Sequence, residues 1–143
     1  MFRFCATPAT FFLMLLILAG LTACDSSGGG PPEEEEDTTA PGTPSGLEGT
    51  SGDGSVALEW SAPGASDLEG YNVYRSESSF SNPSGAQMLN GSDLVGEASY
   101  RDDEAGNGTT YFYRVSAVDE SDNESDLSGM VEKTPFPDPP DDP

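Results

Sequence analysis

Apolar and polar side chains alternate along much of the chain between residues 41 and 135. The longest such segment is 109–118, in which one set of side chains alternates with a second. The first set is Tyr111, Tyr113, Val115 and Ala117, and the second is Phe112, Arg114, Ser116 and Val118. Successive side chains of a strand point to opposite faces of a sheet, and no Gly or Pro interrupts this segment. It therefore predicts one long β-strand with an inner and an outer face.

Six shorter segments predict further strands, separated by turns that contain Gly or Pro. They are 41–47, 55–63, 70–75, 94–95, 99–102 and 130–134. In the second of these, Val56, Leu58 and Trp60 alternate with smaller or polar residues, which predicts a half-buried strand. Residues 76–92 are rich in Ser, Asn, Gly and Pro and predict a loop with one short apolar piece at 87–89. Seven short strands in about 95 residues predict an all-β sandwich.

The composition argues against several classes of protein. The 143 residues include 26 acidic and 5 basic ones, for a net charge of −21, and no His. Surfaces that bind nucleic acid are basic, so no nucleic acid is expected as a partner. The absence of His removes the commonest general base and transition-metal ligand. Both cysteines, Cys5 and Cys24, precede the predicted sandwich, which leaves that domain without a disulfide or a cysteine metal site.

The N-terminal residues have the features of a secretory signal. Residues 11–19 are an unbroken apolar run, shorter than the roughly 20 residues that span a bilayer. The sequence Leu21-Thr22-Ala23-Cys24 follows and resembles the lipobox of bacterial lipoproteins. The resemblance implies that 1–23 is removed and that Cys24 carries the lipid, which would anchor the chain on the bacterial cell membrane or outer membrane, outside the cytoplasm. An ordinary cleaved signal and a retained membrane helix are the alternatives.

Residues 24–40 predict a flexible acidic linker. Gly and Ser give flexibility, Pro resists helix formation, and the run 33–37 contains only acidic residues, which repel one another. Some bacteria treat acidic residues behind the lipidated Cys as an export signal, and others treat Asp directly after it, here Asp25, as a retention signal. Both the leaflet and the membrane therefore stay open. The Pro- and Asp-rich residues 136–143 predict a disordered tail.

Several segments together resemble the fibronectin type III family as it occurs in bacterial secreted proteins. They are Leu58-Glu59-Trp60-Ser61-Ala62-Pro63, Tyr71-Asn72-Val73-Tyr74-Arg75, Tyr100-Arg101-Asp102, the run from Gly108 to Asp119, and Asn123-Glu124-Ser125. The resemblance implies a seven-stranded immunoglobulin-like β-sandwich over 41–135, in which Trp60 is a core residue and Tyr111 is the tyrosine-corner residue. Ala105-Gly106-Asn107 stands where the family usually has Leu before a Gly-Thr turn, which predicts looser packing around Tyr111.

The outer face of the central strand offers a candidate binding patch. Tyr74 has the parity opposite to Tyr71 and Val73, and the family's sheet order implies that its strand lies beside 109–118. The patch would consist of Tyr74, Phe112 and Arg114, all pointing outward. Aromatic side chains with an Arg are typical of protein-contact hot spots. An ordinary cross-strand group that covers the sheet is the alternative.

Two groups of acidic residues raise the question of metal binding or catalysis. Asp119, Ser121 and Asn123 have the spacing of a calcium loop, but Glu124 replaces its required Gly and Met130 its required Glu. The carboxylates of 102–104 suggest hydrolysis, yet a small sandwich has little room for a cleft, and no Gly-x-Ser-x-Gly motif occurs. We therefore expect no metal site, no cofactor and no catalytic residue.

The sequence thus predicts a non-catalytic, membrane-anchored module of the bacterial envelope. It would act as an interaction or spacer domain, with an envelope or extracellular protein as its partner. Contact with carbohydrate, either polysaccharide or peptidoglycan, is the alternative, and only Tyr74 and Phe112 qualify as exposed aromatic platforms for it. Residues 41–135 contain 17 acidic and 4 basic residues, and the resulting repulsion suggests a host that lives in high salt.

Overall fold

The computed structural model of the protein describes residues 36–138. The predicted signal sequence, Cys24 and the linker as far as residue 35 lie outside the described residues, as do 139–143 of the predicted tail. Within the described range no helix is long and apolar enough to cross a membrane.

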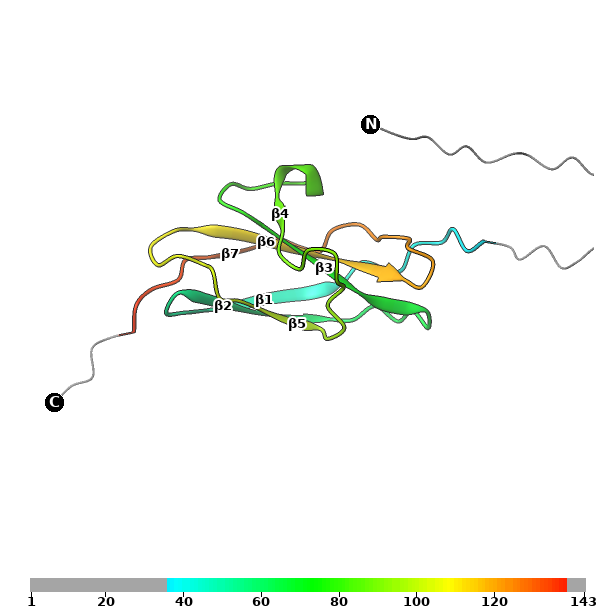
Figure 1. Cartoon of the computed structure of the whole chain (residues 1–143), viewed down its shortest axis with the longest axis horizontal. Helices are drawn as coiled ribbons and strands as arrows, with labels where there is room; N and C mark the ends of the chain where they lie inside the picture. Colours follow the sequence, from blue (N-terminus) through cyan, green and yellow to red (C-terminus); the bar gives the residue numbers. More distant parts are fainter. Residues whose placement is uncertain (1–35, 139–143) are drawn as a thin grey trace, which may run out of the picture. The chain divides into compact units, whose positions relative to one another are not determined.

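Two antiparallel sheets pack face to face (Figure 1). One has the order β1-β2-β5 and the other the order β4-β3-β6-β7. The strands are β1 Ser45–Gly52, β2 Ser55–Ser61, β3 Leu68–Ser76, β4 Gln87–Met88, β5 Ser99–Asp102, β6 Tyr111–Asp119 and β7 Val131–Lys133, with one 3₁₀ helix, η1, at Pro83–Gly85. The prediction of an all-β, immunoglobulin-like sandwich with seven strands is confirmed.

The core lies between the sheets and follows the alternation of the sequence. Strand β6 buries Tyr111, Tyr113, Val115 and Ala117, and β2 contributes Val56, Leu58 and Trp60 from the opposite sheet. The ring of Trp60 meets that of Tyr71 edge to face, with centroids 5.1 Å apart. Edge-to-face aromatic pairs stabilise a core by more than the burial of their apolar area alone contributes. Ala105 is buried in the same cluster, so this smaller side chain occupies the core where the family usually has Leu.

The edge of β3 differs from the prediction. Residues 94–95 do not form a strand, because only Val95 pairs there, in a single bridge with Tyr71. The strand beside β3 is instead β4 at Gln87–Met88. Between the two pairings the side-chain oxygen of Asn90 accepts the backbone N–H of Val73 at 2.9 Å, so a side chain replaces the backbone and interrupts the ladder. Gly70 permits the close approach, since a Cβ there would lie 2.8 Å from the Cβ of Leu94.

The chain enters and leaves the sandwich near opposite ends of β1. Pro44, which is buried, precedes β1, and the backbone N–H of Phe136 donates to the carbonyl of Gly52 at the far end at 3.2 Å. From its first to its last Cα, an eight-residue strand makes seven steps of about 3.3 Å, so β1 spans about 23 Å. Figure 1 shows the two ends of the described domain emerging on opposite sides.

Candidate functional site

The predicted binding patch is divided by the structure. Tyr74 lies outside the core cluster but is only 2% exposed, so the prediction that its ring is exposed is wrong. Its hydroxyl donates to Oε1 of Glu124 at 2.6 Å, which belongs to the segment that follows β6. Phe112 and Arg114 are half-buried on β6. Alternation correctly places Tyr74 outside the core, but it does not reveal that the chain after β6 returns to cover that face.

Glu124 collects three hydrogen bonds on this face. Besides Tyr74, the hydroxyl of Ser116 donates to its Oε1 at 2.5 Å and the amide of Asn72 at 3.2 Å. Burial opposes ionisation of this carboxyl, but the hydrogen bonds from Ser116, Tyr74 and Asn72 outweigh it and lower the pKa of Glu124. Burial and the neighbouring Glu124 raise the pKa of Tyr74 to about 12. At neutral pH a carboxylate therefore faces a neutral phenol, and this arrangement holds 119–126 against the sheet.

A second group on the same sheet was not predicted. Phe80, from the loop between β3 and η1, lies over the guanidinium of Arg114, whose Cζ is 6.0 Å from the ring centroid. Together with Met130, which is 41% exposed, they line a hollow of about 490 Å³, which we call the Phe80 hollow. Its rim carries Ser79, Ser81 and Asn82. The signal in the sequence was a single Phe within a loop of small polar residues, and periodicity assigns such a residue to no face.

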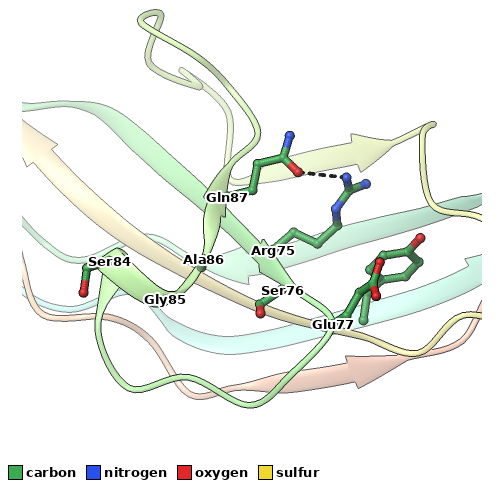
Figure 2. A pocket seen from close by; sticks show the side chains of 8 residues that line it. Arg75, Ser76, Glu77, Ser84, Gly85, Ala86 and Gln87 are labelled. Atoms are coloured by element: carbon green, nitrogen blue, oxygen red, sulfur yellow. Dashed lines mark hydrogen bonds between the residues drawn. The ribbon is translucent and has the colours of Figure 1, made fainter.

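A second hollow lies at the edge of the sandwich beside β4. Figure 2 shows the side chain of Arg75 directed toward Gln87, whose Oε1 accepts from Nη2 at 3.1 Å. This hollow has a volume of about 480 Å³ and is also lined by Glu77 and Tyr111. The guanidinium lies 5.0 Å from the centroid of the Tyr111 ring and is bound to Asp102 of the opposite sheet. Because its charge is already paired with the carboxylate of Asp102, we assign Arg75 a structural role that links the two sheets.

The two residues expected in the core do lie there. Trp60 is buried between the sheets, and so is Tyr111. The hydroxyl of Tyr111 accepts the backbone N–H of Gly106 at 3.2 Å, which is the kind of upstream backbone contact that a tyrosine corner makes. Neither ring forms a sugar platform.

The carboxylate of Asp119 lies in the turn after β6, where the sequence has the spacing of a calcium loop. Its Oδ1 accepts the backbone N–H groups of Ser121 at 2.9 Å and Asn123 at 2.8 Å, so it closes the turn after β6. Burial would raise the pKa of Asp119, but the hydrogen bonds from Asn123 and Ser121 prevail and lower it. Asp119 also forms a cluster with Asp37 and Asp67, whose carboxylate oxygens lie within 4.8 Å of one another. Such oxygens could hold a cation, and otherwise they repel one another.

The acidic segment that precedes the domain touches this turn. The carbonyl of Asp37 accepts the side-chain amide of Asn123 at 2.9 Å. The end of the predicted linker is therefore docked against the loop after β6, at the end of the domain where β1 begins.

Comparison with known proteins assigns the fold to a family. A family model described as "Fibronectin type III domain SaeA third domain" matches residues 44–135. An amylopullulanase of Thermoanaerobacterium saccharolyticum is 41% identical over 90 residues, which are 63% of this chain and 6% of that enzyme. Exoglucanase B of Cellulomonas fimi is 40% identical over 101 residues, which are 68% of this chain and 8% of that enzyme.

A solved structure agrees with this assignment. An Fn3-like protein from Clostridium thermocellum has a TM-score of 0.54 and 27% identity, and the match covers 68% of this chain and 96% of that one. The matches to the two enzymes span less than a tenth of each, so they concern a single domain of much larger proteins. With its two sheets, its buried Trp60 and Tyr111 and the family match over most of the sandwich, this chain belongs to the fibronectin type III family.

Proposed function

We propose that this chain is a lipid-anchored, non-catalytic accessory module that works next to polysaccharide at the bacterial cell envelope. The observation that carries the proposal is the similarity of its one domain to a small part of enzymes named amylopullulanase and exoglucanase. The shared stretch is the type III domain, so the accessory role is carried over and the activity of the whole enzyme is not. The similarity favours polysaccharide over a protein partner.

The acidic side chains support a non-catalytic role. Glycoside hydrolysis needs two carboxyls that face each other across a cleft. Here Asp102 is bound to Arg75 and Tyr113, and Asp103 to Arg101. These carboxylates have structural partners rather than a shared cleft. The absence of His from the sequence agrees with this role.

The membrane anchor rests on the sequence around Cys24. To test it, the full chain is expressed in a bacterium grown with radiolabelled palmitate, and label on the chain is measured. We expect label on the parent chain and none on Cys24→Ser. Cys5→Ser is the matched control, because Cys5 leaves with the signal, and it should label normally. Label that persists in Cys24→Ser would contradict the anchor.

The contact with polysaccharide is tested on the purified full chain in detergent. Native gels that contain amylopectin, hydroxyethyl cellulose or no polymer are compared, and retardation is measured. Peptidoglycan sacculi are tested in parallel by sedimentation. We expect retardation by at least one polymer. A chain that migrates equally in all gels and does not sediment with sacculi would exclude this part of the proposal.

A spacer role is the second candidate. The observation that favours it is the emergence of the described chain near opposite ends of β1, about 23 Å apart. A spacer needs no contact surface, so it predicts no retardation and no partner. Crosslinking of the anchored protein in its own cells, followed by mass spectrometry, distinguishes these roles, because one enriched protein would indicate an interaction module instead.

A further inference from the structure

We propose that the Phe80 hollow binds one hexopyranose unit of a neutral glucan. The inference rests on the proposed function and adds to it a site and a ligand class. Three separate parts of the chain build the hollow, since Phe80 follows β3, Arg114 lies on β6 and Met130 precedes β7. Its volume of about 490 Å³ falls within the range of about 300–1,000 Å³ that is typical of small-ligand sites.

The ring of Phe80 is held in place by its neighbours. The Cζ of Arg114 lies 6.0 Å from the ring centroid, and a Cβ at Gly85 would be in ordinary van der Waals contact with the Cβ of Phe80, at 3.5 Å. A ring with one side fixed on a cation can offer its remaining exposed surface without losing much side-chain entropy on binding. The apolar C–H face of a pyranose is the natural complement of such a ring.

Arg114 has hydrogen-bond donors to spare. Its Nη1 donates to the carbonyl of Ser128 at 2.8 Å, but its Nε is buried and makes no hydrogen bond to any described residue. Within residues 36–138, Arg75 and Arg101 are paired with carboxylates and Arg114 is not, although acidic residues greatly outnumber basic ones. A guanidinium has five N–H donors, and sugar hydroxyls are acceptors that need no counter-charge.

The rim of the hollow supplies the remaining polar groups. Asn82 accepts a hydrogen bond from Ser84 through Oδ1, which leaves its amide N–H groups for a ligand. Ser79 and Ser81 add hydroxyls, which both donate and accept. Hydroxyl groups of a hexose also do both, so the rim matches them in kind.

Charge and composition decide between ligand classes. The chain carries a net charge of −21, which repels anionic polysaccharides and favours neutral ones. Protein interfaces are depleted in Ser and involve about 20–30 residues per partner, whereas seven residues line this hollow and two of them are Ser. A neutral sugar unit therefore fits better than an acidic polymer or a protein.

Two other hollows fit a glucan less well. In the hollow of Figure 2 the guanidinium of Arg75 is already bound to Asp102 and Gln87. A hollow of about 650 Å³ near β4 is lined by four carboxylates and no aromatic ring; they are Glu69, Asp93, Asp122 and Glu124. Of these three hollows within residues 36–138, only the Phe80 hollow combines an aromatic ring with an Arg that has no carboxylate partner.

The test compares variants of the full chain in native gels that contain amylopectin or hydroxyethyl cellulose. We expect Phe80→Ala to raise the apparent Kd about tenfold or more, the factor that corresponds to about 1.4 kcal/mol. Phe80→Tyr, which keeps the ring, should bind like the parent. Phe112→Ala is the matched control, because it removes a half-buried Phe outside the hollow, from β6, the strand that also carries Arg114. The fluorescence of Trp60, the only Trp, reports whether each variant is folded.

The outcomes separate this inference from the proposed function. A parent chain that binds glucan as tightly as Phe80→Ala overturns the site and leaves the proposed function standing. A parent chain that binds no polysaccharide overturns the site and also the polysaccharide part of the proposed function. Tighter binding of polygalacturonate than of neutral glucans overturns the ligand class, and a protein crosslinked at the hollow without glucan binding overturns it in favour of a protein partner. If Phe80→Ala does not fold, NMR spectra of the parent titrated with maltoheptaose must shift at Asn82 and Gly85, and shifts confined to other residues overturn the proposal.

Discussion

The guanidinium of Arg75 on β3 donates to both carboxylate oxygens of Asp102 on β5, at 3.0 and 2.9 Å. The two residues belong to different sheets, so this ion pair links the halves of the sandwich. Their side chains are 12% and 3% exposed. The hydroxyl of Tyr113 donates to the same carboxylate at 2.9 Å, and burial together with that carboxylate raises the pKa of Tyr113. A charged, hydrogen-bonded group thus occupies the end of an otherwise apolar core.

Removing one member of this pair should destabilise the domain strongly. Asp102→Ala leaves the buried guanidinium of Arg75 without its counter-charge, and we expect the free energy of unfolding to fall by about 3–5 kcal/mol. Urea unfolding followed by Trp60 fluorescence measures the change. The double variant Arg75→Met/Asp102→Leu replaces both charges by apolar groups and should recover much of the loss, because desolvation offsets most of the attraction in a buried pair.

The pair of Arg101 and Asp103 is the matched control. Its side chains are 61% and 69% exposed, although the two atoms lie 2.5 Å apart. Exposed pairs contribute about 0–1 kcal/mol, so Asp103→Ala should change stability little. If Asp102→Ala cost no more than Asp103→Ala, the link between the sheets would contribute nothing to stability.

Sequence alternation predicts which face of a strand each side chain occupies, but it does not predict which other segment of the chain packs over that face. The alternation in 109–118 and 55–61 identified the core residues of β6 and β2, because an inner face has a period of two. The same alternation put Tyr74 outside the core but could not show that Glu124, 50 residues away, binds its hydroxyl. It also gave Arg75 the parity of Tyr71 and Val73, but only the fold shows which carboxylate lies opposite. Phe80 lies in a loop, where alternation has no meaning.

Tyr74 should behave as a buried residue. We expect Tyr74→Ala to lower the free energy of unfolding by about 3–5 kcal/mol, because it leaves a cavity under the segment after β6. Tyr74→Phe keeps the ring and removes one hydrogen bond to a carboxylate, so about 1–3 kcal/mol is expected. Thermal and urea unfolding measure both. If Tyr74→Ala unfolded like the parent chain, the ring would be exposed in solution, as alternation alone predicted.

The contact between Tyr74 and Glu124 makes stability depend on pH. The hydrogen bonds hold the pKa of Glu124 in the folded protein below its ordinary value of 4.5. Folding therefore favours the carboxylate, so its contribution is fully present above pH 4.5 and is lost as pH falls through the lowered pKa. Urea unfolding at several pH values should show this loss on the acid side.

Glu124→Gln isolates that contribution. The amide does not titrate, so we expect a smaller fall in stability below pH 4.5 than in the parent chain. Asp119, whose pKa is also lowered, supplies part of the remaining slope. Glu69, an exposed carboxylate on β3, gives the control variant Glu69→Gln, which should leave the slope nearly unchanged. Equal slopes in Glu124→Gln and the parent chain would mean that Glu124 does not couple protonation to folding.

Repulsion among acidic residues should make the domain more stable in high salt. The strongest local case is the cluster of Asp37, Asp67 and Asp119, whose oxygens lie within 4.8 Å of one another. Two like charges at such a distance repel by about 1 kcal/mol in water, and molar salt shortens the screening length to about 3 Å. In chelator-containing buffer we expect Asp67→Asn to raise Tm by about 4–8 °C at low salt, because about 1 kcal/mol has that effect in a domain of this size.

In 1 M NaCl the parent chain should gain stability. The difference in Tm between the parent chain and Asp67→Asn should nearly vanish, since salt then screens the repulsion that the substitution removes. Asp93→Asn, outside the cluster, is the control and should shift Tm less. A Tm that does not rise with salt would contradict the hypothesis of a high-salt host, and a lower Tm for Asp67→Asn would show that this carboxylate is bound to something favourable rather than repelled by its neighbours.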